Sequence, residues 1–182
     1  EKDPNKPFAG TTIYVYNWGD YIAEDTLQLF TEATGIKVIY DPFDSNEAMY
    51  AKYKSGAVNY DVLIPSDYMI EKLIAENELL PLNYDNIPNV KYIDSSFRNL
   101  SYDPDDTYSV PYFWGTLGIL YNTEMVKEEV DSWDILWDSK YSGKIIMMDS
   151  VRDSFAVALK RLGYSLNSAN KAQVDEALAT LV

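Results

Sequence analysis

Three short segments combine aromatic rings with carboxylates or hydroxyls, and each directly follows a segment that the sequence predicts to be a strand. These segments are Trp18-Gly19-Asp20-Tyr21, Ser66-Asp67-Tyr68 and Asp149-Ser150-Val151-Arg152-Asp153. An aromatic face attracts a cation by roughly 0.5–2 kcal/mol, and a carboxylate accepts charge-assisted hydrogen bonds from an ammonium group. Aromatic walls also pack against methylene groups that separate two charged ends. The segments therefore predict a site for an organic ammonium ion, and a linear diamine or polyamine would use all of these contacts.

Each segment also has a purely structural interpretation. Residues 18–20 fit an ordinary turn, because Gly and Asp are common turn residues. Ser66 or Asp67 could cap the helix that follows, and Ser150 with Asp153 fits the capping-box pattern S-x-x-D/E. The structural interpretation is favoured for each segment alone, whereas their common place at one sheet edge favours a binding site.

The elements that must position these segments alternate between strand and helix patterns. Strands are expected at residues 13–16, 36–40 and 61–65, and helices at residues 22–33, 45–53 and 68–77. Gly35 is expected to end the first helix, and Asp44 or Ser45 to begin the second. The run at residues 61–65 is almost continuously apolar, which is typical of a buried parallel strand. This alternation predicts an α/β layer with a mostly parallel sheet, in which ligands bind at the carboxyl ends of the strands.

The remainder of the chain divides at a candidate hinge. Residues 81–106 are rich in Asn, Asp and Pro and predict a long loop with one short helix. The elements expected after this loop are strands at 108–112, 118–121 and 144–148, and helices at 124–128, 133–137, 150–162 and 170–181. Phe113-Trp114-Gly115-Thr116 is the expected hinge. We therefore expect a flexible leader at residues 1–10, a first lobe at 11–113 and a second lobe at 114–182.

Composition excludes several classes of protein. The 182 residues contain 15 Lys and Arg against 29 Asp and Glu, a net charge of −14, with no Cys and no His. A Ser–His–Asp triad, a thiolate nucleophile and a Cys-ligated metal are therefore impossible. The charge argues against nucleic acid as a partner, because phosphate binding needs clustered basic residues. No stretch approaches the about 20 apolar residues of a membrane-spanning helix.

One acidic cluster, Asp103-Pro104-Asp105-Asp106, could be considered for calcium. It lacks the spacing of an EF-hand loop, so a solvated turn is the preferred interpretation. We expect no metal site and no cofactor.

Beyond these patterns, the chain resembles the spermidine/putrescine-binding proteins of ABC transporters from about Thr11 to its end. The motif N-W-x-D/E-Y occurs at residues 17–21, and V-P-Y-x-W-G occurs at residues 110–115. The matching segments are residues 14–22, 31–40, 45–52, 60–66, 108–115 and 161–165. The two motifs are specific in combination.

The resemblance implies a type II periplasmic-binding-protein-like fold, in which two lobes joined by a hinge close on a polyamine and deliver it to a membrane permease. By position, Trp18 and Tyr21 would be aromatic walls and Asp20 an ammonium acceptor. Ser66 and Tyr68 match contacts of the first lobe. The protein would work outside the cytoplasm, free in the periplasm or attached to the cell surface by a lipid anchor. It would meet the membrane only through such a tether or the permease.

The second lobe departs from the family pattern. The family usually has Asp at position 150 and Glu at position 153, whereas this chain has Ser150 and Asp153. One charge is therefore missing, and the other carboxylate is one methylene shorter. Family members also run well beyond 182 residues, so we expect this chain to be an N-terminal portion with an incomplete second lobe.

Other functions stay open at this point. The solute could be a sugar, thiamine or a metal complex instead of a polyamine. An enzyme would use Asp20 with Asp153 as a carboxylate pair, as glycoside hydrolases do. An acidic surface could also bind a cationic partner in a role other than transport.

Overall fold

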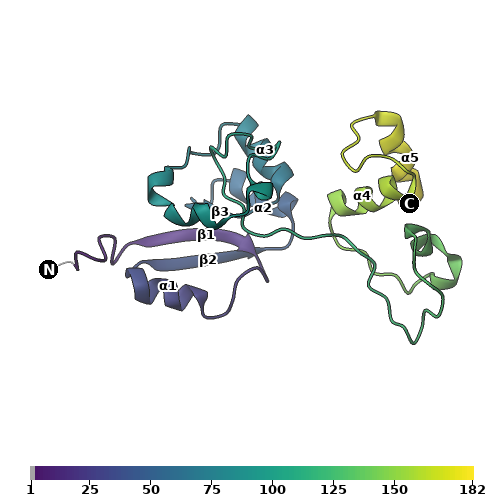
Figure 1. The fold of residues 1–182 in the computed structure, drawn as a ribbon, viewed down its shortest axis with the longest axis horizontal. Helices are drawn as coiled ribbons and strands as arrows, with labels where there is room; N and C mark the ends of the chain where they lie inside the picture. Colours follow the sequence, from purple (N-terminus) through teal and green to yellow (C-terminus); the bar gives the residue numbers. More distant parts are fainter. Residues whose placement is uncertain (1–2) are drawn as a thin grey trace. The chain divides into compact units, whose positions relative to one another are not determined.

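The structure, a computed structural model, describes residues 3–182 and divides them into two compact units. The first unit ends at Trp114, and the second is Gly115–Val182 (Figure 1). Residues 1 and 2 of the expected leader lie outside the described residues. Further along that segment, the backbone N–H of Gly10 donates to the carbonyl of Gly35 at 2.8 Å. A side chain at position 35 would place its Cβ 2.6 Å from that of Ala9, so this close approach requires glycine.

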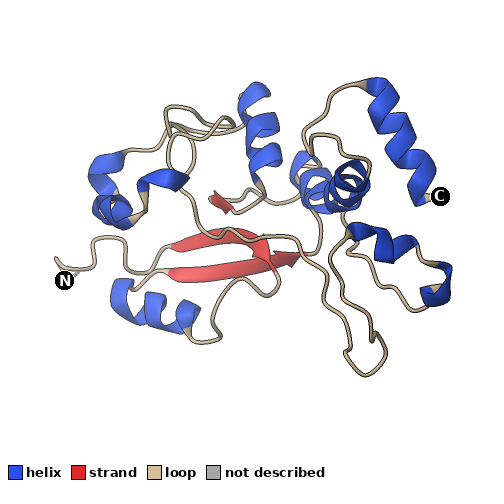
Figure 2. Cartoon of the chain, turned by 45° about the vertical axis from the view of Figure 1, so that its right-hand side comes forward, coloured by secondary structure: helices blue, strands red, loops and turns tan. Residues whose placement is uncertain are grey.

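A parallel sheet forms the centre of the first unit. Among residues 3–182 it has three strands in the order β2-β1-β3, which are β1 (Thr12–Trp18), β2 (Lys37–Phe43) and β3 (Val62–Leu63). The pairing of β1 with β2 runs from Thr12 opposite Lys37 to Trp18 opposite Phe43 (Figure 2). All three strands lie where the sequence predicts them. Strand β1 is longer than expected, so Trp18 belongs to the strand and not to the turn.

The helices of the first unit also follow the predicted order. They are α1 (Thr26–Thr34), α2 (Asn46–Lys54) and α3 (Asp67–Ala75). Gly35 ends α1 in the left-handed conformation, with φ of 72°, as predicted. The hydroxyl oxygen of Ser45 accepts a hydrogen bond from the backbone N–H of Ala48 at 3.2 Å and so begins α2. Figure 1 shows α1 on one side of the strands, with α2 and α3 on the other.

The core of this unit lies between the sheet and helices α2 and α3. Its buried side chains are Tyr16, Phe43, Met49, Met69 and Leu73. None of the described residues of α1 is buried. The prediction of a buried third strand is wrong in one respect, because Val62 is exposed. With only two paired residues, β3 is a short edge strand in the described sheet.

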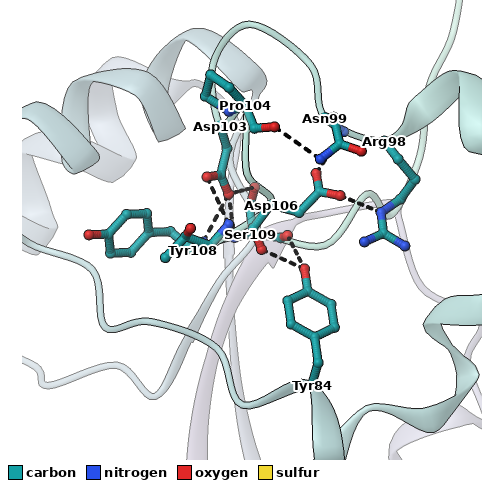
Figure 3. Close-up of polar contacts among 9 residues, drawn as sticks. Tyr84, Arg98, Asn99, Asp103, Pro104, Asp106, Tyr108 and Ser109 are labelled. Atoms are coloured by element: carbon teal, nitrogen blue, oxygen red, sulfur yellow. Dashed lines mark hydrogen bonds and ion pairs between the residues drawn. The ribbon is translucent and has the colours of Figure 1, made fainter.

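The predicted loop contains the short 3₁₀ helices η1 (Tyr84–Asn86), η2 (Pro88–Tyr92) and η3 (Ser95–Phe97). The acidic cluster follows them. The carboxylate of Asp103 accepts hydrogen bonds from the backbone N–H groups of Thr107, Tyr108 and Ser109 at 2.8–3.0 Å (Figure 3). The Ser109 hydroxyl donates to the same carboxylate at 2.8 Å. The Asp103 side chain therefore satisfies three consecutive backbone N–H donors that have no partner in a strand or helix.

Asp106 stabilises the preceding part of the same loop. Its carboxylate accepts from Arg98 Nε at 2.5 Å and from the backbone N–H of Asn99 at 2.9 Å. The Tyr84 hydroxyl donates to the backbone carbonyl of Asp106 at 2.6 Å. The predicted turn is present, with Pro104 and Asp105 exposed. Asp103 and Asp106 are only 3% and 5% exposed, so the prediction that the turn is solvated is wrong for these two side chains. Within residues 3–182, no group of three or more acidic side chains is arranged to hold a metal ion.

The second unit consists of helices joined by long irregular segments in the described residues. It contains the 3₁₀ helices η4 (Trp133–Trp137) and η5 (Ser139–Tyr141), and the helices α4 (Val151–Arg161) and α5 (Lys171–Leu181). Ala158 and Leu159 of α4 pack against Ala177 of α5 in a separate core. The Trp137 indole N–H donates to the carbonyl of Thr180 at 2.6 Å. None of the described helices has the length and apolar character needed to cross a membrane.

Several predicted elements do not form in the described part of the chain. Residues 108–112, 118–121 and 144–148 are not strands. Strand propensity is expressed only when a segment pairs with a neighbour, and Leu120 and Ile146 remain almost fully exposed. In the first of these segments, Asp103 already binds the backbone donors of Tyr108 and Ser109.

The expected helix at 124–128 is also wrong. The Asn122 side chain accepts from the backbone N–H of Glu124 at 2.8 Å, and the Asn122 carbonyl accepts from Met125 and Val126. These bonds close a single turn. A nucleus of this size is unfavourable without further turns to extend it.

Candidate functional site

The first group of candidate residues lies where β1 ends. The register places Trp18 opposite Phe43, and their ring centroids are 4.7 Å apart at an interplanar angle of 52°. The Tyr21 ring lies 5.8 Å from that of Trp18, so the strand and the turn after it bring the two predicted aromatic walls together. The Trp18 carbonyl accepts a hydrogen bond from the Tyr40 hydroxyl at 2.9 Å. Burial raises the pKa of that hydroxyl, which therefore remains a donor at neutral pH.

Asp20 lies in the turn between these two rings. Its side chain is exposed. A turn that carries both a carboxylate and aromatic rings offers the residue types that bind an ammonium group through charge and ring quadrupole. The predicted turn and the predicted ligand contact are therefore compatible at this position.

A segment far along the chain completes the aromatic group. The Phe113 and Tyr21 rings form an edge-to-face pair with centroids 5.5 Å apart, and the Tyr112 hydroxyl donates to the Tyr21 carbonyl at 2.6 Å. Both side chains are exposed. Sequence reasoning assigned Phe113 only to the hinge and missed this contact. No local pattern in the sequence could have revealed these contacts, because Tyr112 and Tyr21 are 91 positions apart.

The second group lies where β3 ends and α3 begins. The Asn46 side chain forms two hydrogen bonds with Ser66: its Nδ2 donates to Ser66 Oγ, and its Oδ1 accepts from the Ser66 backbone N–H, both at 3.0 Å. Ser66 precedes α3, but its hydroxyl makes no capping hydrogen bond within the described residues. The predicted cap is therefore wrong for the Ser66 side chain, which is oriented by α2 instead.

Tyr68, in the first turn of α3, is also oriented by α2. Its hydroxyl donates to Glu47 Oε1 at 3.0 Å, and its ring is half-buried against the core that Trp18 also contacts. Sequence reasoning missed Asn46 and Glu47. The only available signal was their place in the matching segment 45–52.

Ser150 and Asp153 belong to the second unit. The Ser150 hydroxyl oxygen accepts from the Asp153 backbone N–H at 3.2 Å, which confirms the predicted cap at the start of α4. Asp153 lies in the first turn, where a negative charge is favourable to the helix dipole. Both side chains are half-buried.

The lysines of α2 and α3 form ion pairs with carboxylates of the same unit. Lys72 Nζ and the Tyr50 hydroxyl each lie 2.9 Å from the Glu76 carboxylate. Lys72, followed by Tyr50, lowers the pKa of Glu76 from its ordinary value of 4.5 to about 2. Lys54 also contacts Glu76, at 3.2 Å. This ion-pair group joins the end of α3 to α2 and has a structural role.

The second unit has an open acidic depression of about 260 Å³, lined in part by Glu128, Asp131 and Asp134. Lys140, followed by Tyr141, lowers the pKa of Glu128 from 4.5 to about 2. Arg161 Nε binds Asp134 at 2.7 Å. Lys140 and Arg161 of the same unit thus already bind Glu128 and Asp134, and the depression carries no argument for a ligand.

Comparison with known proteins adds an independent observation. Residues 26–182 match the family described as bacterial extracellular solute-binding protein. The spermidine/putrescine-binding periplasmic protein of Escherichia coli (strain K12) is 39% identical over 170 residues, which is 91% of this chain and 48% of the relative. The chain thus spans about half the length of the curated relatives it matches.

Solved structures agree with this comparison. A structure from Listeria monocytogenes superposes with a TM-score of 0.90 at 47% identity, and covers 94% of this chain and 53% of the other. A spermidine/putrescine ABC transporter substrate-binding protein from Streptococcus pneumoniae gives a TM-score of 0.74 at 48% identity, with the same coverage. Both likenesses extend through almost the entire chain.

Proposed function

This chain belongs to the bacterial extracellular solute-binding protein family, and from this premise we propose that it captures a polyamine, spermidine or putrescine, for an ABC transporter. The observation that carries the proposal is the contact between the Trp18 and Tyr21 rings at the end of β1, in the turn that also carries the exposed Asp20. Rings and a carboxylate together favour a cation with an apolar body over a neutral or anionic solute.

Each candidate residue is proposed to contact a different part of the polyamine. Trp18 and Tyr21 pack against the methylene groups, and Asp20 accepts hydrogen bonds from one ammonium group. Ser66 and Tyr68 contribute a hydroxyl acceptor and a further ring.

In the second unit, Asp153 and Ser150 are proposed to contact another ammonium group. Residues 113–116 would be the hinge about which the units close, and contacts from both would stabilise the closed state. Binding requires no bond to be made or broken, so the protein acts as a receptor and not as an enzyme.

The family and the relatives support a location outside the cytoplasm. There the polyamine-loaded protein would deliver its ligand to a membrane permease. Attachment by a lipid anchor and free diffusion in the periplasm are both compatible with this role, and fractionation of cells in the presence and absence of detergent distinguishes them.

Calorimetric titration of the intact protein with putrescine, spermidine and spermine tests the proposal. We expect Asp20→Asn to weaken binding about tenfold or more, because a charge-assisted hydrogen bond contributes about 1.5–3 kcal/mol. Trp18→Leu removes a cation–π contact and should weaken binding about 2- to 30-fold. The matched control is Asp105→Asn, which removes an exposed charge from the loop of the same unit.

No heat with any polyamine in a folded sample would contradict the proposal. Parallel titrations with a sugar, with thiamine and with a metal complex identify a different solute. A hydrolase would reveal itself by release of product from a chromogenic glycoside.

A further inference from the structure

The first turn of α2 contacts both candidate ligand residues at the start of α3. Asn46 binds Ser66, and Glu47 binds Tyr68. Asn46 is 4% exposed, although it is an amide at the beginning of a helix. A buried amide of this kind is retained only when its polar atoms are satisfied, and here Ser66 satisfies both ends.

The orientation of the Asn46 amide follows from the backbone. The Ser66 N–H can only donate, so the atom facing it must be Oδ1, which leaves Nδ2 to donate to Ser66 Oγ at 3.0 Å. A hydroxyl oxygen accepts two hydrogen bonds and donates one. With one acceptor position used by Asn46, Ser66 retains the capacity to accept a hydrogen bond from an ammonium group.

Glu47 acts on the ring of Tyr68. The hydrogen bond of 3.0 Å from the phenol to the carboxylate restricts rotation of the Tyr68 side chain. It also places a negative charge at the hydroxyl end of the ring, which strengthens the attraction of the ring for a cation. Glu47 is exposed, so its charge acts through solvent as well as through the bond.

We propose that Asn46 and Glu47 are positioning residues of the polyamine site, Asn46 through Ser66 and Glu47 through Tyr68. This inference rests on the proposed function. The negative charge of Glu47 favours ligands with more ammonium groups, so spermidine, with three, gains more from it than putrescine, with two. Ser45 starts the same turn by capping α2, and therefore three successive residues place this part of the site.

Double-mutant cycles in the intact protein test the two contacts, with polyamine affinity from calorimetry as the readout. Glu47→Gln should weaken spermidine binding about 3- to 10-fold and putrescine binding less. In a Tyr68→Phe background, the effect of Glu47→Gln should shrink by at least half, because the bond through which it acts is already absent. Glu71→Gln, an equal loss of exposed charge on α3, is the matched control and should change neither affinity.

The same cycle applies to Asn46→Asp with Ser66→Ala. Asp keeps the oxygen that faces the Ser66 N–H but removes the Nδ2 donor, so its effect should largely disappear when the Ser66 hydroxyl is absent. Melting temperatures of all variants verify that the compared samples are folded. Additive effects in both cycles would overturn the proposal.

A measurement without ligand separates this inference from the proposed function. With tyrosine labelled at ring carbon ζ and the Tyr68 signal assigned by Tyr68→Phe, the Glu47→Gln variant should shift that signal and Glu71→Gln should not. A shift in a protein that binds no polyamine would contradict only the proposed function. An unchanged Tyr68 signal in a polyamine-binding protein would contradict only the positioning role of Glu47.

Discussion

The hydroxyl of Tyr112 donates a hydrogen bond to the backbone carbonyl of Tyr21 at 2.6 Å, across 91 positions of the chain. Tyr21 follows the central strand, and Tyr112 lies just before the boundary of the first unit at Trp114. The adjacent Phe113 ring contacts Tyr21 as well. One hydrogen bond and one ring contact therefore join Tyr21, a proposed ligand-binding residue, to the segment at the end of the first unit.

Removing that bond should loosen the turn after β1. We expect Tyr112→Phe to lower the free energy of unfolding by about 0.5–1.5 kcal/mol and to weaken polyamine binding several-fold. Urea denaturation and calorimetry measure the two effects. Tyr92→Phe, an exposed tyrosine of the same unit, serves as the control; an equal loss of affinity there would argue against a specific role for Tyr112.

Asp103 should be far more sensitive to substitution than its exposed neighbour. Asp103→Asn places an amide group against the backbone donors of residues 107–109, so we expect the free energy of unfolding to fall by about 2–3 kcal/mol. Asp105→Asn alters the same loop at an exposed position and should be neutral. Denaturation of both variants provides the comparison, and equal stability would contradict the role assigned to Asp103.

The ion-pair group around Glu76 predicts a dependence of stability on pH. Because the folded protein lowers the pKa of Glu76 from 4.5 to about 2, folding favours the ionised carboxylate. This contribution is complete above pH 4.5 and is lost as the pH falls toward 2. Thermal unfolding between pH 7 and pH 2 should therefore show a smaller decline for Glu76→Gln than for the wild type. Parallel curves would exclude Glu76 as a source of the acid sensitivity.

Shortening a leucine side chain of the first unit to alanine should lower the free energy of unfolding in proportion to how buried that leucine is. Leu73 is 0% exposed and Leu80 is 86% exposed. Leu73→Ala should cost about 2–5 kcal/mol of unfolding free energy, because it removes buried methyl groups and leaves a cavity. Leu80→Ala should change it by less than about 0.5 kcal/mol. Circular dichroism during urea denaturation compares the two variants, and similar midpoints would mean that α3 does not form the core described.

Local patterns in the sequence predict the first half of the fold correctly. The apolar runs of β1, β2 and β3 alternate with helical patterns, and Ser45 and Gly35 mark helix ends by their own side-chain and backbone preferences. These signals act over a few residues. The segments at 118–121 and 144–148 carry the same kind of local signal, yet a strand also needs a partner, and pairing is not encoded in the segment alone.

For the candidate site too, the sequence predicts the local contacts but not those between residues far apart in the chain. Trp18 and Tyr21 are three positions apart, so the turn predicted between them was enough to bring their rings together. Asn46, Glu47 and Tyr112 reach the site from 20 to 91 positions away. Asp103 was expected in a solvated turn because the acidic cluster lacks the spacing of a calcium-binding loop, whereas its actual environment is set by the backbone donors that the loop folds around it.

The order of the strands has a consequence for hydrogen exchange. Strand β1 is bonded on both sides and carries Trp18 at its end, whereas Ser66 and Tyr68 follow β3, which pairs through only two residues. Amide hydrogens of β1 should therefore exchange slowly even in the free protein. Those of residues 62–70 should exchange quickly until a ligand slows them, so deuterium uptake would report binding chiefly from the β3–α3 corner.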